Sequence, residues 1–355
     1  MSPIIILSFV IAGLSCLGVA MLRRWAERHS VLDIPNKRSS HDRPIPHVGG
    51  LAIVTITLLG VVIFWFQDPT WSVAEIFTFV AGGGFVACAG LVDDLYGMSR
   101  RLRLLIHGLC AMVVILGIGS WNTVVIPLSG QLDLGWLGVL ITFVWITGLT
   151  NAYNFMDGMD GLAGGQAVVA GSAWIMLGWL SDQGLVMLVG ALLASSCLGF
   201  LVHNWPPARI FMGDVGSIFL GYTFAGLSVI GAQRDPTLAL SGVLILWPFV
   251  FDTSFTLLRR LSRGENIFVA HRSHLYQRLL IVGHTHRFLS LLYITLAAVG
   301  AIMAQIFTMG VPTSSFLVVF LVPLMCLVLW AFVIREERKY ARSLRPRVPG
   351  LDEAG

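Results

Sequence analysis

The chain has 355 residues, of which 56% are hydrophobic and only 12% are charged, and its mean hydropathy is +0.82. Soluble proteins carry about 25% charged residues, so this chain has too few to cover a surface that faces water. The composition therefore excludes a soluble globular domain, a disordered segment and a disulfide-stapled secreted module. The five cysteines lie singly within apolar runs, which is typical of packing residues and not of a zinc or disulfide framework.

Apolar stretches long enough to cross a bilayer follow one another along the chain, most of them close to about 20 residues. We predict eleven transmembrane helices, at residues 3–22, 49–66, 75–92, 104–119, 136–150, 163–180, 184–202, 215–232, 238–257, 288–307 and 313–334. No internal repeat or linker divides them. The expected fold is all-α, a polytopic helical bundle with one integral-membrane domain over residues 1–334 and a basic cytoplasmic tail over residues 335–355.

The basic residues lie almost entirely on one side of the predicted helices. Of the 23 lysines and arginines, all but Arg234 fall within the segments 23–43, 100–103, 209, 259–287 and 335–347. The positive-inside rule places these segments in the cytoplasm and the N-terminus outside. The nine histidines lie on or beside the same side. The net charge of +4 follows from this topology, and nucleic-acid binding is not expected.

Five aspartates stand at the cytoplasmic ends of the predicted helices. Asp93 and Asp94 follow the third helix, Asp157 and Asp160 follow the fifth, and Asp214 precedes the eighth. Close carboxylates repel one another, so such a group predicts a divalent cation, and Mg2+ prefers carboxylates together with substrate phosphates. For any single one of these acids, simple solvation in a loop is the alternative interpretation.

Groups that suit a phosphate lie in the same segments. The candidate bidentate donors are Arg103, Arg209, Arg272 and Arg278. Asn154 offers a neutral carbonyl oxygen, and Asp214 lies between Gly213 and Gly216, where a backbone can approach phosphate oxygens closely. The sequence has neither a P-loop nor a GxSxG motif. Together these features predict chemistry on a diphosphate at the cytoplasmic surface.

Four motifs follow one another along this side of the chain. They are Asp93-Asp94, the segment from Asn151 to Gly161 (Asn-Ala-Tyr-Asn-Phe-Met-Asp-Gly-Met-Asp-Gly), Phe211-Met212-Gly213-Asp214-Val215-Gly216-Ser217, and His271-Arg272-Ser273-His274. In this order they resemble the polyprenyl-phosphate N-acetylaminosugar-1-phosphate transferases of glycosyltransferase family 4. The histidine motif and the eleven predicted spans are more similar to the enzymes that initiate O-antigen than to those that make lipid I.

The resemblance implies an enzyme that transfers an N-acetylaminosugar 1-phosphate from a UDP-sugar to undecaprenyl phosphate and releases UMP. This reaction would initiate O-antigen lipopolysaccharide or another cell-envelope polysaccharide. The implied cofactor is Mg2+, with Mn2+ as an alternative. The implied location is a bacterial inner membrane, with the active site on its cytoplasmic face. A homodimer is left open. The alternatives are a lipid I-forming phospho-N-acetylmuramoyl-pentapeptide transferase and, in a different class, a transporter of a lipid-linked sugar or an ion.

The resemblance also assigns roles to residues by position. The implied metal ligands are Asp214 and Asn154, and the implied catalytic groups are Asp93, Asp94, Asp157, Asp214 and His271. The implied substrate contacts are Asp160, Asn204 and Phe211 at the uridine, Arg103 and Arg272 near the diphosphate, and Arg43 and His274. Asp93 and Asp94 stay open between outer metal ligands, substrate organisers and a base, and His271 is equally compatible with a structural role.

Overall fold

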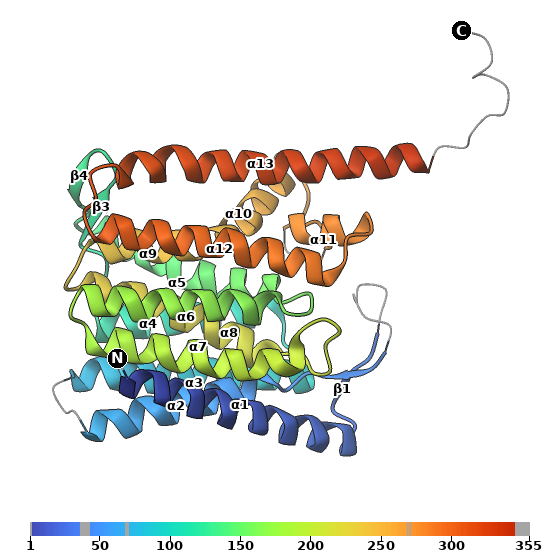
Figure 1. Cartoon of the computed structure of the whole chain (residues 1–355), viewed down its shortest axis with the longest axis horizontal. Coiled ribbons are helices and arrows are strands. Elements are labelled where there is room, and N and C mark those ends of the chain that lie inside the picture. The colour runs from blue at the N-terminus through green and yellow to red at the C-terminus, as the bar shows by residue number, and fades with distance from the viewer. Residues whose placement is uncertain (1, 36–42, 68–70, 268, 270, 345–355) are drawn as a thin grey trace, which may run out of the picture.

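The computed structural model describes residues 2–35, 43–67, 71–267, 269 and 271–344 as a bundle of helices that run side by side (Figure 1). The helices are α1 (Ser2–Arg28), α2 (Gly50–Gln67), α3 (Val73–Tyr96), α4 (Arg100–Gly117), α5 (Leu137–Met156), α6 (Leu162–Leu180), α7 (Gly184–Asn204), α8 (Asp214–Ala232), α9 (Thr237–Ile245), α10 (Trp247–Ser262), α11 (Leu275–Ile281), α12 (His286–Thr308) and α13 (Ser314–Ser343). Two short antiparallel pairs, β1 (Leu32–Asp33) with β2 (Ile45–Pro46) and β3 (Thr123–Ile126) with β4 (Gly130–Asp133), lie outside the bundle. The predicted all-α membrane fold is confirmed.

Each predicted apolar stretch is helical in the structure. Among the described residues, nine helices are long and apolar enough to cross a bilayer, and the bent pair α9–α10 makes a tenth candidate. The remaining predicted span corresponds to α4, which has only 18 residues and begins with Arg100, Arg101 and Arg103, so no uncharged stretch of spanning length is left in it. The helix α5 extends to Met156, six residues beyond the predicted end, so Asn154 lies on its last turn.

The ninth predicted span is not one continuous helix. The structure breaks it at Leu246 into α9 and α10, which meet at an angle of 75°. Pro248, in the first turn of α10, has no backbone N–H with which to continue the hydrogen bonds of α9. At the break, the side chain of Gln166 donates to the carbonyl oxygen of Ile245 at 3.0 Å. This bond satisfies a backbone group that a break inside a membrane would otherwise leave unpaired.

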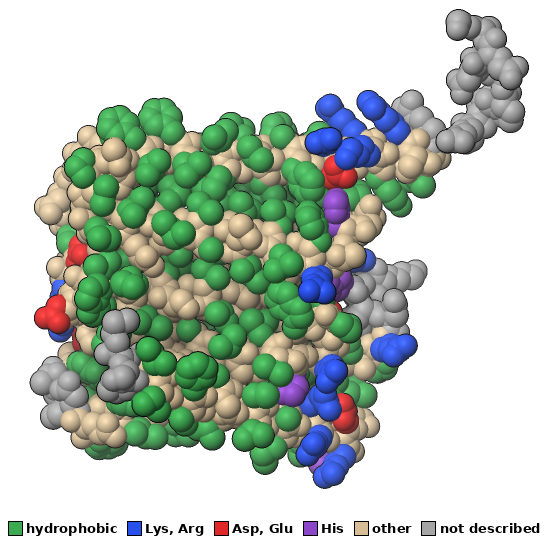
Figure 2. Space-filling model, in the orientation of Figure 1, with side chains coloured by type: hydrophobic (Ala, Val, Ile, Leu, Met, Phe, Trp, Pro, Cys, Tyr) green, Lys and Arg blue, Asp and Glu red, His purple; other side chains and the backbone are tan. Residues whose placement is uncertain are grey.

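Charged side chains gather at one end of the bundle, whose middle is covered by hydrophobic side chains (Figure 2). We call it the basic end; α1, α10 and α13 finish there, with Arg28, Arg259 and Arg342 in their last turns. Arg234, the predicted exception, lies between α8 and α9 and so at the opposite end. Lys37, Arg38, Arg345 and Arg347, which the topology prediction also used, lie outside the described residues.

The helix α8 forms the centre of the bundle and is buried along its whole length, packed mainly against α3 and α5. Two glycines allow this close packing. A Cβ on Gly90 of α3 would lie 2.7 Å from the carbonyl oxygen of Asp214, and a Cβ on Gly221 of α8 would lie 2.8 Å from the Cα of Thr150 in α5. Small residues of this kind let membrane helices approach each other. The acids at the end of α3 and Asn154 of α5 are thereby brought to the start of α8.

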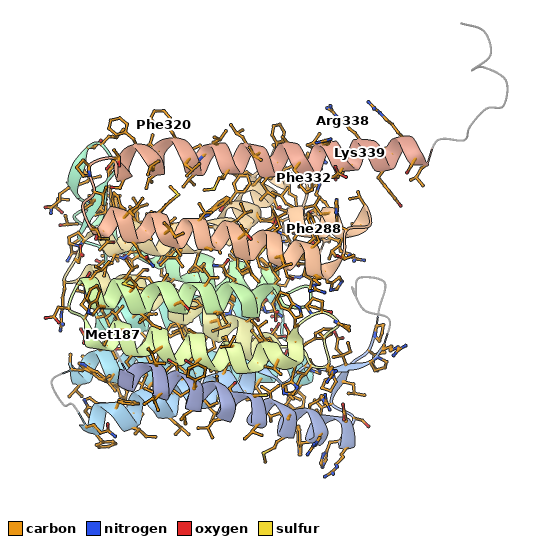
Figure 3. The ribbon with its side chains drawn as sticks, in the orientation of Figure 1. Met187, Phe288, Phe320, Phe332, Arg338 and Lys339 are labelled. Atoms are coloured by element: carbon orange, nitrogen blue, oxygen red, sulfur yellow. The ribbon has the colours of Figure 1, made fainter. Side chains whose placement is uncertain are left out.

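The last helix, α13, lies at the side of the bundle and is mostly exposed (Figure 1). It contacts α12 through rings, with the centroids of Phe288 and Phe332 6.4 Å apart, and Phe320 is exposed nearer its start (Figure 3). Beyond these rings the same helix carries Arg338 and Lys339. The tail predicted from residue 335 therefore begins as a continuation of α13 up to Ser343, and residues 345–355 lie outside the described part of the chain.

Candidate active site

Five polar side chains from four helices meet at the basic end. The guanidinium of Arg103 (α4) pairs through Nη2 with Asp93 (α3) and with Asp214 (α8), the latter at 3.2 Å, and its Nη1 donates to Asn154 Oδ1 (α5) at 3.1 Å. Asn154 Nδ2 donates to Asp214 Oδ1 at 2.7 Å. The structure thus brings together Asp93, Arg103, Asn154 and Asp214 from segments far apart in the sequence. We call these residues, with Asp94, the acidic cluster.

Asp94 caps the central helix. Its Oδ1 accepts from the backbone N–H of Asp214 at 2.8 Å, and its Oδ2 accepts from that of Val215 at 3.0 Å. The residue that precedes α8 is Gly213, which has no side chain to serve as a cap. A carboxylate at a helix N-terminus satisfies free N–H groups and opposes the positive end of the helix dipole. Of the roles left open for Asp94, this geometry favours the organiser.

The cluster has the chemistry of a magnesium site, although Arg103 serves as its cation here. All candidate ligands are carboxylate or amide oxygens, the type that Mg2+ binds. Within the described residues, no three His, Cys, Asp or Glu side chains are arranged to hold a metal ion without rearrangement. Asn154 turns its amide nitrogen towards Asp214 and its oxygen towards Arg103. Binding of a cation by Asp214 and Asn154 therefore requires Arg103 to move and the amide of Asn154 to turn.

Asp157 lies just beyond α5, close to the acidic cluster. Burial, together with the charge of Asp214, raises the pKa of this carboxyl to about 8. It is therefore largely protonated at neutral pH in this arrangement. A divalent cation nearby would favour the ionised form, because it reverses the sign of the local field.

The predicted uridine residues form a second group. Asp160 Oδ2 accepts from the backbone N–H of Ala208 at 2.9 Å, and Asp160 Oδ1 lies 3.3 Å from His286 Nδ1. Asn204 is buried; its Oδ1 accepts from Gly161 N–H at 2.9 Å and its Nδ2 donates to the carbonyl of Ile210 at 2.9 Å. The side chain of Asn204 thus ties together the two loops that carry Asp160 and Phe211.

The backbone around Phe211 is hydrogen-bonded to β2 and to the stretch that follows it. Phe211 N–H donates to the carbonyl of Pro46 at 2.7 Å, and Gly49 N–H donates to the carbonyl of Phe211 at 3.0 Å. Arg43, which lies two residues before β2, is exposed. The structure therefore brings the segment of Arg43 to the same end as Phe211.

The histidine motif lies in the loop between α10 and α11. His271 Nδ1 lies 2.8 Å from Ser273 Oγ and 3.4 Å from the backbone nitrogen of Ser273. The pKa of His271 is lowered to about 4, mainly by burial of the ring and to a smaller extent by the neighbouring His274 and Arg260. Arg272 is half-buried and forms no ion pair with another described residue. His271 is thus a neutral hydrogen-bond donor and Arg272 an available cation.

One predicted phosphate donor is committed elsewhere. Arg278 is buried in α11, and its Nε and Nη2 bind the two carboxylate oxygens of Glu337 of α13 at 2.7 and 2.6 Å. Two of its three nitrogens are thus engaged by Glu337, and its role as a phosphate donor stays a prediction. Arg209, by contrast, is exposed between α7 and α8.

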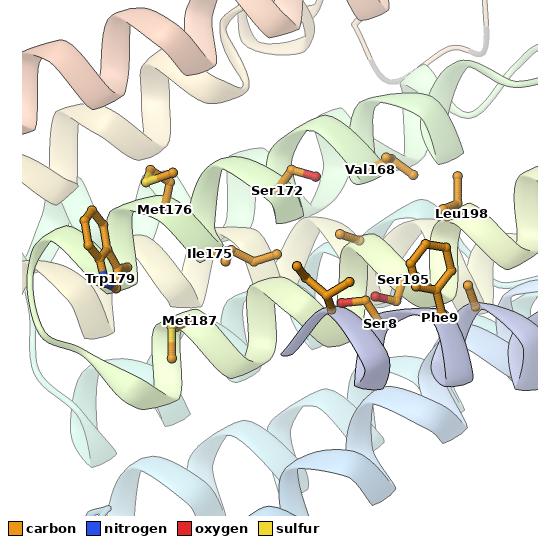
Figure 4. A pocket seen from close by; sticks show the side chains of 13 residues that line it. Ser8, Phe9, Val168, Ser172, Ile175, Met176, Trp179, Met187, Ser195 and Leu198 are labelled. Atoms are coloured by element: carbon orange, nitrogen blue, oxygen red, sulfur yellow. The ribbon is translucent and has the colours of Figure 1, made fainter. Parts of the chain in front are cut away.

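One apolar recess of the described surface is not part of this site. It has a volume of about 460 Å3 and lies between α1, α6 and α7, with Trp179 and Met187 near one end and Phe9 and Leu198 near the other (Figure 4). Its lining is apolar apart from three serines and includes no titratable side chain.

Several residues of the site could not be recognised as such in the sequence. Ser217 receives a second bond from Asn154 Nδ2 at 2.9 Å, His286 faces Asp160, and Glu337 holds Arg278. Asp252 of α10 is fully buried beneath the histidine motif. Ser217 is the last residue of the third motif, and Asp252 carried a signal as an acid inside a predicted span, towards its cytoplasmic end.

Comparison with known proteins agrees with the arrangement of these motifs. The Glycosyl transferase family 4 profile matches residues 76–232. The chain is 31% identical to a probable undecaprenyl-phosphate N-acetylglucosaminyl 1-phosphate transferase of Bacillus subtilis, over 89% of this chain and 88% of that protein. It is also 31% identical to a decaprenyl-phosphate N-acetylglucosaminephosphotransferase of Mycobacterium tuberculosis (79% and 77% covered), and 30% identical to a phospho-N-acetylmuramoyl-pentapeptide-transferase of Halalkalibacterium halodurans (74% and 84%). The chain belongs to glycosyl transferase family 4 and is a membrane-embedded transferase.

Proposed function

We propose that this enzyme transfers an N-acetylaminosugar 1-phosphate from a UDP-N-acetylaminosugar to undecaprenyl phosphate. The products are UMP and an undecaprenyl-diphosphate sugar that starts a lipid-linked glycan. Two relatives whose alignments cover most of this chain are named as N-acetylglucosamine-phosphate transferases that act on a polyprenyl phosphate, and this supports a polyprenyl-phosphate acceptor. The pentapeptide transferase covers less of it than the Bacillus protein does.

The observation that carries the proposal is the acidic cluster at the basic end.

In the proposed reaction, an oxygen of the acceptor phosphate forms a bond to the phosphorus next to the sugar. The bond between this phosphorus and the oxygen that bridges it to UMP breaks. The acceptor has a second pKa of about 6 and is largely a dianion near neutral pH. It therefore needs little help from a base, and the main barrier is the approach of two anions.

The residues of the chain can lower this barrier by electrostatics and positioning. Arg103 and Arg272 supply positive charge near the diphosphate, and the neutral imidazole of His271 supplies a hydrogen-bond donor. Asp214 and Asn154 would hold Mg2+, whose charge, when it is bound, offsets that of the diphosphate. Asp94 keeps Asp214 in place through the start of α8. We place the reaction on the cytoplasmic face of a bacterial inner membrane, because the basic residues gather at this end.

A covalent route is the alternative, in which an aspartate attacks the donor first. Purified enzyme that contains Mg2+ and a UDP-sugar but no lipid acceptor distinguishes the two routes. Direct attack predicts no UMP beyond background. Release of one equivalent of UMP per enzyme would establish the covalent route.

The proposed function is tested with purified protein in detergent, undecaprenyl phosphate, Mg2+ and a panel of UDP-N-acetylaminosugars. We expect equal amounts of UMP and lipid-linked sugar from at least one donor. Asp214→Asn should lower turnover by orders of magnitude without loss of folding. Asp182→Asn is the matched control, since Asp182 is exposed at the opposite end and its φ of 51° suits asparagine. Normal Mg2+-dependent turnover of Asp214→Asn would refute the assignment of Asp214.

A further inference from the structure

Asp252 is a buried carboxylate to which the proposed reaction gives no role. It lies on α10 with 0% of its surface exposed. A buried carboxylate is costly unless several donors surround it. Here the backbone N–H groups of Leu275 and Tyr276 donate to it at 2.8 and 3.1 Å, and the hydroxyls of Tyr293 and Thr256 donate at 2.6 and 3.3 Å. Such a set of donors indicates a defined structural task.

That task concerns the loop that carries the histidine motif. Leu275 and Tyr276 are the first two residues of α11, and they directly follow His271–His274. The same carboxylate lies 3.3 Å from His274 Nδ1. Because the carboxylate of Asp252 accepts a hydrogen bond from Nδ1, the neutral imidazole of His274 carries its proton on Nδ1, and Nε2 is left unprotonated. Asp252 thus fixes both the end of the loop and the tautomer and orientation of His274.

The anchored loop is also joined to the acidic cluster. Tyr276 Oη donates to the carbonyl of Phe155 at 3.0 Å, and the rings of His274 and Phe155 have their centroids 6.0 Å apart. Phe155 directly follows Asn154 in α5. A continuous chain of contacts therefore leads from Asp252 through the start of α11 to Asn154.

We propose that Asp252 is a positioning residue for the donor diphosphate, which acts by holding His274 and the His271–His274 loop at a fixed place beside Asn154. This inference rests on the proposed function, because it assumes that the loop meets the UDP-sugar. Asp252 itself touches no substrate. Its loss should affect the donor and not the lipid acceptor.

Asp252→Asn tests the proposal directly. The amide can accept at only one of its two ends, so its NH2 must face backbone N–H groups or hydroxyls that already donate. We expect the KM for the UDP-sugar to rise about tenfold or more, because a displaced loop loses contacts to the donor that are made equally in the ground state and in the transition state. The KM for undecaprenyl phosphate should change less than about twofold. Asp252→Glu, which keeps the carboxylate, should recover part of the loss.

The matched control is Asp235→Asn at the other end of the bundle. Asp235 also holds a helix start, since its Oδ1 accepts from Thr237 N–H at 3.0 Å and its Oδ2 accepts from Ser181 Oγ at 3.0 Å. It should lower thermal stability without changing either KM. A general loss of stability is in this way separated from a positioning effect.

A double-mutant cycle and hydrogen exchange complete the test. Because Asp252 acts in part through His274, Asp252→Asn combined with His274→Gln should cost less in kcat/KM than the sum of the two single losses. Hydrogen exchange at Leu275 and Tyr276 should rise in Asp252→Asn even without substrate. Additive losses, or faster exchange with an unchanged KM for the donor, would overturn the proposal while leaving the proposed function intact. If Asp252→Asn does not fold, Tyr276→Phe, which cuts the link to Phe155, must raise the same KM.

If the wild-type enzyme releases no UMP from any UDP-sugar, it is the proposed function that fails. Hydrogen exchange then still reports whether Asp252 holds the loop. The two failures are therefore distinguishable.

Discussion

Asp94→Asn separates an organising role of this residue from a role as a base. Each carboxylate oxygen of Asp94 accepts one N–H at the start of α8, from Asp214 and from Val215. Asparagine has nearly the same volume, but it can accept only one of the two bonds and turns its NH2 towards the other N–H. Loss of an N-cap costs about 0.5–2 kcal/mol, which should leave the protein folded and less stable.

The effect on activity should exceed the effect on stability. Asp214 is the first residue of α8, so its carboxylate shifts when the cap is lost. A misplacement of about 1 Å costs about a hundredfold, and we expect a fall of this size in kcat. Asp94→Ala, which removes both acceptors, should be worse than Asp94→Asn.

The assay is UMP release over a range of pH values, together with thermal unfolding in detergent. An organiser leaves the shape of the pH profile unchanged in Asp94→Asn, whereas removal of a base abolishes the limb that reports its deprotonation. Asp182→Asn serves again as the matched control. Wild-type turnover in Asp94→Asn, or equal losses in the asparagine and alanine variants with an altered pH profile, would refute the reasoning.

Three further predictions concern the neighbouring groups. Chelation of Mg2+ should abolish UMP release, and restored Mg2+ should recover it. Because Arg103 competes with the cation for Asp214, the Arg103→Met variant should bind Mg2+ more tightly than the wild type in a titration. Equal affinities of the two proteins for Mg2+ would contradict this. The imidazole of His271, with its pKa lowered to about 4, should stay neutral above pH 5. Because the unfolded chain takes up this proton near pH 6.5, thermal stability should fall as the pH drops from 6.5 towards 4, and the slope should be smaller in His271→Gln. Glu337→Gln should weaken the bond to buried Arg278 and destabilise the protein by about 1–3 kcal/mol. Hydrogen exchange in α11 should become faster in this variant. Unchanged exchange in α11 would argue against the pairing of Glu337 with Arg278.

The sequence predicted the helical stretches and their common charged end because both depend on composition within single segments. It missed the break at Leu246 because the apolar run continues on both sides, although Pro248 in the interior of the predicted span 238–257 is a signal for such a break. The partner of Arg278 was also out of reach, because Glu337 lies 59 residues further on, in a segment that composition marked only as a basic tail.

The motifs that predicted the site located its residues but not their separate tasks. Asp93 and Asp94 are neighbours in the sequence, yet Asp93 pairs with Arg103 and Asp94 caps α8. This division depends on the direction in which each side chain leaves α3 and on the close approach at Gly90, which no local pattern records. The donors around Asp252 come from α11 and α12 and were equally invisible.

The bidentate pair between α11 and α13 has a practical consequence for handling this protein. A chain shortened after residue 334 would still have a last helix long enough to cross the bilayer, and it would insert normally. It would, however, leave the guanidinium of Arg278 enclosed without its counter-charge, so the defect would show in the histidine loop and not in membrane targeting. Purification tags are therefore best joined beyond residue 344, so that the ion pair between Glu337 and Arg278 is preserved.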